Sequence, residues 1–219
     1  MAVTIYLVRH GRTVWNLEGR LQGSGDSALV EEGIIGAKKT GIALKHIPFT
    51  AAYSSMQKRA QDTANYILAE NERSNIPHFH HKGLNEFDFG SWEGMKSVDL
   101  QENDEYWVMK RTPAEYEAKS NGGERFEQLY QRVTQVFNQI AELHKNAGNV
   151  LIVSHGMTLT LLTAVLKGIA WQDFRNEEKH SFVINTAITK VEVDNGRITV
   201  LEFNNTNHLD NMPNDQYKG

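Results

Sequence analysis

The sequence contains no cysteine among its 219 residues. Disulfide bonds, thiolate zinc sites and a cysteine nucleophile are therefore excluded together. The absence fits a protein of a reducing compartment, so we expect a cytoplasmic location. Proline is also scarce, with 4 residues, whereas 17 glycines and 40% hydrophobic residues are typical of an ordinary globular protein.

An excess of positive charge is missing as well. Lysine and arginine number 23 against 27 aspartates and glutamates, which gives a net charge of -4. Contacts to nucleic-acid phosphates need a net or clustered positive surface, so the composition argues against a nucleic-acid binder. The hydrophobic runs Val150–Val153 and Leu161–Leu166 are far shorter than the ~20 residues of a membrane-spanning helix. The N-terminal run Val3–Val8 leads directly to Arg9, without the basic segment that precedes the core of a signal peptide.

Short hydrophobic runs alternate with helical patterns along the chain. Val3–Val8 and Val150–Val153 predict buried strands, and Ala51–Tyr53 predicts a weaker one. Helices are expected over 30–46, 126–144 and 157–166. A further helix is expected to begin at a capping box formed by residues 54–57. An Asp-Asn-Gly turn between the runs 188–193 and 198–203 predicts a hairpin. This order predicts a three-layer α/β/α sandwich with a mostly parallel central sheet and an antiparallel edge.

Residues 87–121 interrupt the alternation. They are rich in glutamate, lysine and aromatic residues, contain Pro113, and show only short helical patterns. We predict that they form a helical cap insertion within a single domain spanning residues 1–219. The polar residues 204–219 are expected to be poorly ordered.

Two similar motifs end in His-Gly. Arg9-His10-Gly11 follows the first strand, and Ser154-His155-Gly156 follows the strand before the penultimate helix. Ligands of open α/β sheets bind outside the carboxyl ends of the strands, so we expect His10 and His155 to meet in one pocket. Arg9, Arg59 and Asn16 are expected at the same edge, where planar guanidinium groups suit a phosphoryl dianion. The set predicts a phosphate site that needs no metal.

Taken together, these motifs resemble the histidine phosphatase superfamily, which includes the cofactor-dependent phosphoglycerate mutases. The resemblance is carried by Arg9-His10-Gly11, Thr13-Val14-Trp15-Asn16, Ser54-Ser55, Arg59-Ala60, Thr63-Ala64, Asn85-Glu86, Phe89-Gly90, Trp92-Glu93-Gly94 and Ser154-His155-Gly156. It implies a phosphohistidine mechanism with His10 as the nucleophile and Glu86 as the proton donor. It also implies that the phosphoryl oxygens are held by Arg9, Asn16, Arg59 and His155.

Two positions depart from the pattern of that family. Arg12 stands where relatives often carry glutamate or glutamine, which adds positive charge at the mouth of the site, and Met56 stands where they often carry aspartate. Neither change removes a catalytic group. Arg12, Gln22 and Gly23 are carried over as candidate substrate contacts.

The chemistry is consistent with that assignment. A neutral imidazole can attack phosphorus if its other nitrogen is held as a donor by a backbone carbonyl. Glu86 would protonate the leaving oxygen and then take a proton from the water that hydrolyses the phosphohistidine.

The function predicted on these grounds is metal-independent hydrolysis of phosphate monoesters of small metabolites. A cofactor-dependent phosphoglycerate mutase and a catalytically inactive phosphate-binding protein are the alternatives. The segment Phe87–Trp92 and the acidic-polar tail resemble phosphatases more than mutases, which carry a longer segment after the glutamate and a basic tail. We expect no cofactor and no nucleic-acid or membrane partner, and a homodimer stays open. The histidines at 78, 80 and 81 fit a solvated strand better than a metal site, because the first two share one strand face and the third points away.

Overall fold

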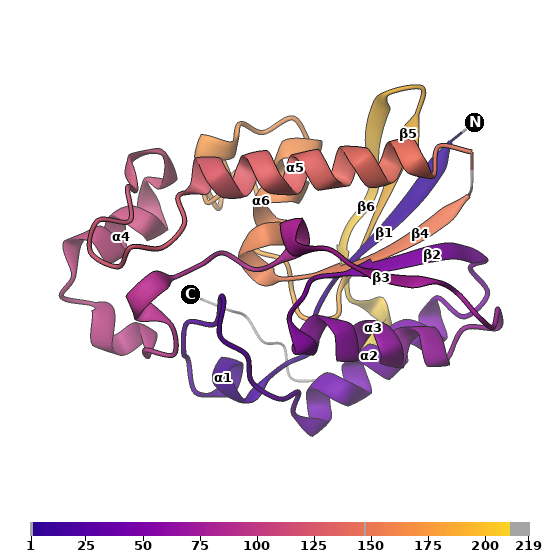
Figure 1. Ribbon diagram of the computed structural model, residues 1–219, viewed down its shortest axis with the longest axis horizontal. Helices are drawn as coiled ribbons and strands as arrows, with labels where there is room; N and C mark the ends of the chain where they lie inside the picture. Colours follow the sequence, from indigo (N-terminus) through magenta and orange to yellow (C-terminus); the bar gives the residue numbers. More distant parts are fainter. Residues whose placement is uncertain (1, 147, 211–219) are drawn as a thin grey trace.

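The computed structural model, which describes residues 2–146 and 148–210, is built on one six-stranded sheet with helices on both faces (Figure 1). The strand order is β3-β2-β4-β1-β5-β6. The strands are β1 (Val3–Arg9), β2 (Phe49–Ser54), β3 (His78–His80), β4 (Asn149–Ser154), β5 (Ile188–Asp194) and β6 (Arg197–Asn205). Strands β1 to β4 are parallel, and the hairpin β5–β6 runs antiparallel at one edge. The predicted sheet is therefore confirmed.

Alternate side chains of β1 enter two separate cores, because successive residues of a strand point to opposite faces. Ile5 and Leu7 pack with α5 (Phe126–Leu143) and α6 (Gly156–Leu166). Tyr6 and Val8 pack in a second core with α3 (Lys58–Ala69) and with Leu44, which caps α2 (Glu31–Ala43). Figure 1 shows α5 and α6 on one side of the sheet and α2 and α3 on the other. The α/β/α sandwich is confirmed.

Helix α5 carries the hydrophobic stripe that its sequence predicts. Steps of three and four place Phe126, Leu129, Val133, Phe137 and Ile140 on one face, and all five are buried. Burying a side chain of this kind contributes about 1.5–3 kcal/mol relative to leaving it exposed. Through this stripe, α5 packs against the sheet and against the chain segment that leads to the candidate site.

Helix α3 begins later than the sequence indicated. The capping box predicted at 54–57 is wrong: Ser54 ends β2, the helix starts at Lys58, and its N-cap Gln57 makes no side-chain cap bond. The Ser55 hydroxyl instead accepts the N–H of Gln57 at 3.2 Å, within a turn. Two consecutive serines fit a helix cap and a strand end equally well, and the pairing of Ser54 with His80 in β3 decides for the strand.

Residues 87–121 contain four short helical segments, η2 (Gly90–Trp92), η3 (Ser97–Leu100), α4 (Asp104–Arg111) and η4 (Pro113–Glu115). They lie beyond the carboxyl ends of the parallel strands, at the left of Figure 1. Their buried aromatic residues Trp92, Tyr106 and Tyr116 belong to the same core as α5. The segment is therefore packed onto the sandwich.

The chain beyond β6 is more ordered than expected. The prediction of poor order from residue 204 is wrong as far as residue 210, because Asn204 and Asn205 complete β6 and η6 (Asn207–Leu209) follows. His208 holds this end against α2, with its Nε2 lying 3.0 Å from the Thr40 hydroxyl. Residues 211–219, the rest of that prediction, lie outside the described residues.

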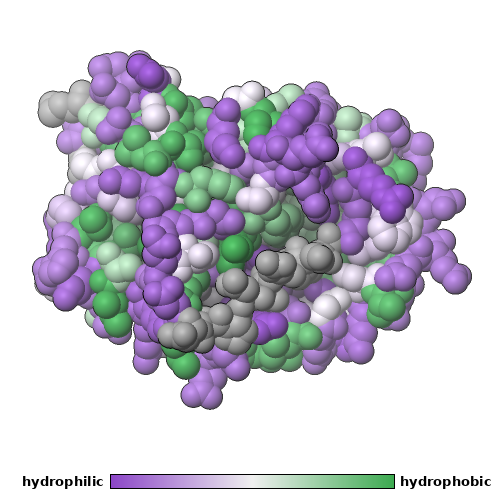
Figure 2. Space-filling model, turned by 180° about the vertical axis from the view of Figure 1, so that it is seen from behind, coloured by the Kyte–Doolittle hydropathy of each residue, from purple (hydrophilic) through white to green (hydrophobic). Residues whose placement is uncertain are grey.

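In the described part of the chain, no helix is both long and apolar enough to cross a bilayer. On the face shown in Figure 2, hydrophobic residues form separate patches between hydrophilic ones.

Candidate active site

The structure brings the two His-Gly motifs together at the carboxyl ends of neighbouring strands. Parallel pairing of β1 with β4 sets Arg9 beside Ser154, so the next residues of the two strands, His10 and His155, lie side by side. Their ring centroids are 5.1 Å apart. Both rings are buried.

The His10 ring is held in one tautomer. Its Nδ1 lies 2.8 Å from the carbonyl oxygen of Gly11, and a carbonyl can only accept, so Nδ1 carries the proton. Burial, and after it the charges of Arg59 and Arg9, hold the pKa of His10 well below its ordinary value. The ring is therefore neutral near pH 7, with the lone pair on Nε2. Asn185 fixes the backbone here by donating its amide to the His10 carbonyl at 2.8 Å, a contact that sequence reasoning missed.

The His155 ring is anchored from the neighbouring strand. Its Nε2 lies 2.6 Å from the hydroxyl of Ser55, just beyond the end of β2. Burial is the largest cause that holds the pKa of His155 well below its ordinary value, and the charge of Arg59 is the next. Both rings are therefore neutral at pH 7.

A small cavity of about 30 Å³ surrounds His10. Its lining comes from six separate segments: Arg9, His10, Asn16, Gln22, Glu86, Phe89, Gly156, Met157 and Phe182. This cavity, called the cup below, matches a small group such as a phosphoryl group rather than a whole metabolite. Of the lining residues, Phe89, Gly156, Met157 and Phe182 were not predicted as site residues.

Arg9 and Asn16 supply a cation and a side-chain amide to the lining of the cup. Arg9 donates from Nη1 to the carbonyl of Val183 at 2.9 Å. Asn16 lies in α1 (Val14–Leu17), where its Oδ1 accepts the N–H of Thr13 at 3.1 Å. Because the oxygen of the amide is used in this way, its NH₂ is the group available to an anion.

Arg59 is the second residue of α3 and is 1% exposed. Its guanidinium turns to loop 22–26, where Nη1 donates to the carbonyl of Gly25 at 2.7 Å and to Asp26 at 3.1 Å, and Nη2 donates to Gly23 at 3.0 Å. Its buried Nε has no partner among the described residues. Arg59 is close enough to His10 and His155 to lower both pKa values.

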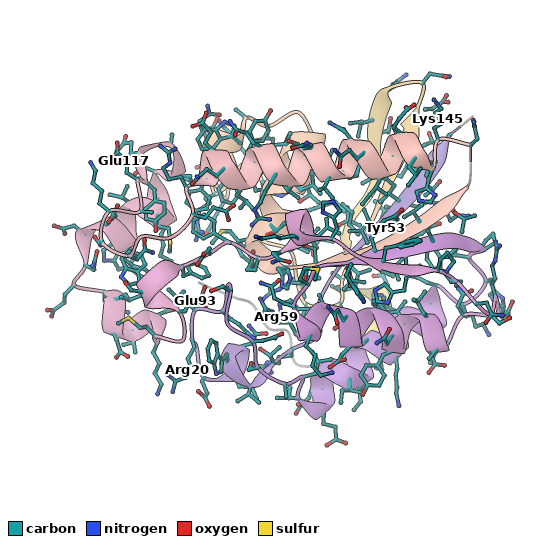
Figure 3. The ribbon with its side chains drawn as sticks, viewed as in Figure 1. Arg20, Tyr53, Arg59, Glu93, Glu117 and Lys145 are labelled. Atoms are coloured by element: carbon teal, nitrogen blue, oxygen red, sulfur yellow. The ribbon has the colours of Figure 1, made fainter. Side chains whose placement is uncertain are left out.

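Glu93 binds the backbone N–H groups of the same loop, a role that the sequence did not reveal. The N–H groups of Gly23, Ser24 and Gly25 donate to its carboxylate over 3.0, 2.7 and 3.2 Å. Figure 3 marks Glu93 and Arg59, which both reach this loop. Glu93 is part of the Trp-Glu-Gly motif, so a signal was present, but its partners lie about seventy residues earlier in the chain.

Two of the predicted substrate contacts lie away from the cup. Gly23 does not line it, and both its N–H and its carbonyl are engaged within the protein. Arg12 does not line it either, and its carbonyl accepts the N–H of Val30 at 3.0 Å, just before α2. Gln22 does line the cup, with its Oε1 accepting the hydroxyl of Thr13 at 2.7 Å.

Glu86 faces the N-terminus of α6. Its carboxylate accepts the N–H of Met157 at 2.9 Å, the N–H of Thr158 at 3.0 Å, the hydroxyl of Thr158 at 2.9 Å and the N–H of Phe87 at 2.9 Å. Backbone donors and the dipole at the start of a helix stabilise a negative charge. The side chain is 8% exposed, so these contacts position it with little freedom.

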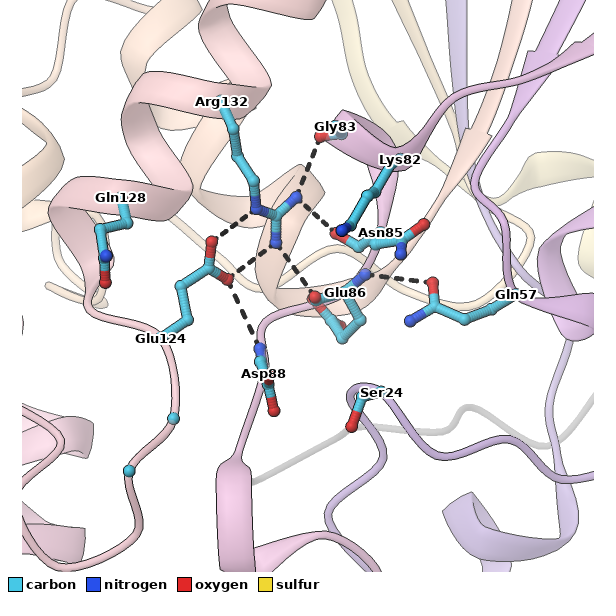
Figure 4. Close-up of a pocket in the computed structure, with 12 residues that line it drawn as sticks. Ser24, Gln57, Lys82, Gly83, Asn85, Glu86, Asp88, Glu124, Gln128 and Arg132 are labelled. Atoms are coloured by element: carbon cyan, nitrogen blue, oxygen red, sulfur yellow. Dashed lines mark hydrogen bonds and ion pairs between the residues drawn. The ribbon is translucent and has the colours of Figure 1, made fainter.

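The backbone that carries Glu86 is clamped by Arg132 of α5 (Figure 4). Nη1 of Arg132 donates to the carbonyls of Gly83 and Asn85 at 2.9 and 2.8 Å, and Nη2 donates to the carbonyl of Glu86 at 3.0 Å. Glu124 completes the clamp by accepting from Nε and Nη2 at 2.5 and 2.8 Å. These residues line a second cavity of about 560 Å³. The sequence offered no signal for Arg132, which sits within an ordinary helical pattern.

The histidines of β3 serve the local structure. His78 and His80 each lie 2.9 Å from the hydroxyl of Ser54, and burial followed by the charge of His80 lowers the pKa of His78 to about 4. His81 points elsewhere, with its Nδ1 accepting the N–H of Gly83 at 3.0 Å. The described residues contain no group of three or more histidine or acidic side chains that could hold a metal ion.

Comparison with known proteins identifies relatives over nearly the whole chain. The family model of the histidine phosphatase superfamily (branch 1) matches residues 5–206. A 2,3-bisphosphoglycerate-dependent phosphoglycerate mutase of Brucella anthropi is 30% identical over 206 residues, which cover 91% of this chain and 96% of that protein. The structure of YhfR of Bacillus stearothermophilus is 32% identical with a TM-score of 0.87 and covers 94% of this chain and 99% of that one. A phosphoserine phosphatase of Entamoeba histolytica, solved in complex with 3-phosphoglyceric acid, is 26% identical with a TM-score of 0.80 and covers 94% and 99%.

Proposed function

Since the chain belongs to the histidine phosphatase superfamily, we propose that it hydrolyses phosphate monoesters of small metabolites through a phosphohistidine on His10. One observation carries the proposal. The bond from His10 Nδ1 to the Gly11 carbonyl leaves Nε2 as a bare nucleophile in a cup lined by Arg9 and Asn16.

In the first step, Nε2 of His10 forms a bond to phosphorus, and the bond from phosphorus to the ester oxygen breaks. Phosphoryl transfer depends mainly on positioning and on neutralising the charge of the phosphoryl oxygens. Arg9, Asn16 and His155 would hold those oxygens, with Arg59 adding positive charge behind them. Glu86 would enter this step protonated and give its proton to the leaving oxygen.

In the second step, water attacks phosphorus and the bond to His10 breaks, which releases inorganic phosphate. Glu86, now a carboxylate, would take the proton of that water. The four donors around its oxygens suit this state, because each stabilises the negative charge. Glu86 would thus act first as an acid and then as a base.

The substrate is proposed to be a small phosphorylated metabolite with a further acidic group. The cup holds little more than the phosphoryl group, so the remainder must lie outside it. A groove of about 620 Å³ shares Phe182 with the cup and is lined by the cationic residues Lys110, Arg111 and Arg175. Because α4 supplies two of these, we propose that residues 87–121 act as a cap that selects the substrate. The 3-phosphoglyceric acid bound by the amoebal relative is a molecule of this kind.

A phosphoglycerate mutase is the second candidate, and the similarity to the mutase of Brucella anthropi favours it. Such an enzyme would return the phosphoryl group to a second hydroxyl instead of to water. A coupled assay for interconversion of 2- and 3-phosphoglycerate, with and without the bisphosphate, separates the two candidates. Mutase turnover faster than phosphate release would replace the proposal.

The direct test is turnover of p-nitrophenyl phosphate, followed by a panel of phosphorylated metabolites ranked by kcat/KM. We expect phosphate release by the wild type, unchanged by EDTA, and none by the His10→Ala variant. Acid-labile label from radioactive substrate should remain on the wild-type protein after rapid quenching. If the wild type and the His10→Ala variant had equal rates on every ester, the protein would be a phosphate-binding protein without catalytic activity.

A further inference from the structure

We propose that Ser55 is a positioning residue that fixes the tautomer of His155, so that this ring offers an N–H from Nδ1 to the phosphoryl group. The consequence for catalysis rests on the proposed function, whereas the tautomer itself does not. The two side chains follow adjacent parallel strands, Ser55 after β2 and His155 after β4. Both are fully buried.

The direction of the bond between them follows from the other contact of the Ser55 hydroxyl. Its Oγ lies 2.6 Å from Nε2 of His155 and accepts the backbone N–H of Gln57 at 3.2 Å. A hydroxyl has one proton to donate. In the described part of the chain, Nε2 of His155 is the one acceptor bonded to that hydroxyl, so the proton points to Nε2. Nε2 then carries the lone pair, and the ring proton resides on Nδ1.

The surroundings of Nδ1 of His155 provide a second, independent observation. It is buried and has no hydrogen-bond partner among the described residues. Buried donors are almost always paired, so a buried N–H without a partner in the protein indicates that a ligand supplies the acceptor. His155 is not among the residues that line the cup, but the centroid of its ring lies 5.1 Å from that of His10. Because Nε2 is bonded to Ser55, Nδ1 is the ring nitrogen left to contact a group bound beside His10.

The two catalytic rings would thus have opposite tautomers. His10 is held through Nδ1 by the Gly11 carbonyl and presents a bare Nε2 to phosphorus. His155 is held through Nε2 by Ser55 and presents the proton of Nδ1 to a phosphoryl oxygen. In the reverse tautomer of His155, the lone pair of Nδ1 would face that oxygen and repel it. Burial and the charge of Arg59 depress the pKa of His155, so a second ring proton cannot replace the tautomer near pH 7.

The turn that carries Ser55 is held in place from several sides. The N–H of Ser55 donates to the carbonyl of Val153 in β4 at 3.3 Å. The Gln57 side chain donates to the carbonyl of Gly23 at 2.7 Å and accepts the N–H of Glu86 at 3.2 Å. The hydroxyl is therefore presented to His155 by a rigid turn.

Long-range ¹H–¹⁵N correlation spectra of protein labelled with ¹⁵N-histidine test the tautomer directly. The chain contains 9 histidines, and the signals lost in His155→Gln identify the ring of His155. We expect a protonated Nδ1 and a bare Nε2 in the wild type at pH 7, and a shift of Nδ1 when inorganic phosphate is added. A protonated Nε2, or protons on both nitrogens, would overturn the proposal. This measurement needs neither turnover nor a Ser55 variant.

Two variants link the tautomer to the rate. Ser55→Ala should populate the other tautomer and lower kcat for p-nitrophenyl phosphate roughly 10²-fold, the usual effect of losing one donor to a developing oxyanion. Ser55→Thr keeps the hydroxyl and should restore both the Nδ1–H signal and most of the rate. Loss of rate in Ser55→Ala with the tautomer unchanged would contradict the positioning role. A wild type that has the Nδ1–H tautomer but hydrolyses no ester would refute the proposed function and leave the tautomer assignment intact.

Discussion

The hydroxyl of Thr158 lies 2.9 Å from Oε1 of Glu86 and also 2.9 Å from the carbonyl oxygen of Asn85. It has one proton for two acceptors. When Glu86 is ionised, the hydroxyl can donate to the carboxylate. When Glu86 is protonated, the hydroxyl can turn to Asn85 and accept the proton of Glu86. Thr158 is therefore suited to both states that the proposed mechanism requires of Glu86.

Replacing Thr158 by valine keeps the shape of the side chain and removes this hydroxyl. We expect Thr158→Val to lower kcat for p-nitrophenyl phosphate roughly 10-fold or more, because one of the four contacts of the general acid–base group is lost. Thr158→Ser is the matched control and should retain most of the rate. A Thr158→Val variant as fast as Thr158→Ser would show that the hydroxyl does not set the rate.

Arg132 is expected to matter for the stability of the fold. Arg132→Met leaves the carbonyls of Gly83, Asn85 and Glu86 and the carboxylate of Glu124 without their donor. Breaking such a network costs about 3–5 kcal/mol of unfolding free energy, measured by urea denaturation. Arg132→Lys should rescue it poorly, since an ammonium cannot reproduce the planar fork. Arg197→Met, at an exposed hairpin position, is the control and should change stability by less than about 0.5 kcal/mol.

Glu93 is expected to affect catalysis by holding loop 22–26 in place. Glu93→Gln removes the charge that the three loop N–H groups share and places an NH₂ among donors, so the loop loosens and Arg59 loses its fixed carbonyl partners. We expect kcat/KM to fall roughly 10-fold, in keeping with about 1.4 kcal/mol of lost transition-state stabilisation. The exposed Glu115→Gln serves as the control. An unchanged kcat/KM in Glu93→Gln would show that the contacts of Glu93 with this loop do not contribute to catalysis.

Stability should decline as the pH falls below about 6.5. Burial, and then the charge of Lys167, lower the pKa of His180 to about 4, and burial also depresses the pKa values of His10 and His155. Between the folded-state value and the ordinary value near 6.5, the unfolded chain binds more protons than the folded one, so the free energy of unfolding rises with pH and drops on acidification. One such group accounts for at most ~1.4 kcal/mol per pH unit.

Urea denaturation at several pH values between 4 and 7 measures this dependence, which follows from the low pKa of His180. His180→Gln should have a shallower slope than the wild type, because one titrating group is removed while an amide can still donate to Thr163. A slope unchanged by the substitution would show that His180 titrates alike in both states.

Much of the architecture follows from local sequence patterns. The β-branched runs of β1 and β4, the stripe on α5 and the Asp-Asn-Gly turn of the hairpin each depend on residues close together in the chain. The same holds for the two His-Gly motifs, because a motif after each of two parallel strands must reach the same edge of the sheet.

The serine pair at the end of β2 marks where local patterns stop being sufficient. Ser54 and Ser55 match a helix cap as well as a strand end, and strand pairing with β3 removed the ambiguity. That pairing, between residues more than twenty positions apart, is invisible to a pattern that looks a few residues ahead.

By itself, the sequence determined the α/β order of the chain and the residues that meet at the sheet edge, because hydrophobic periodicity and strand-end motifs are local. Only the tertiary structure decided how those residues are held: the Ser55 hydroxyl on His155, the Arg132 clamp behind Glu86 and the Glu93 carboxylate on loop 22–26. The partners in these contacts are separated by 100, 46 and 69 positions. Hydrogen bonds of this kind depend on ångström-scale placement of distant segments, which packing sets and no local pattern encodes.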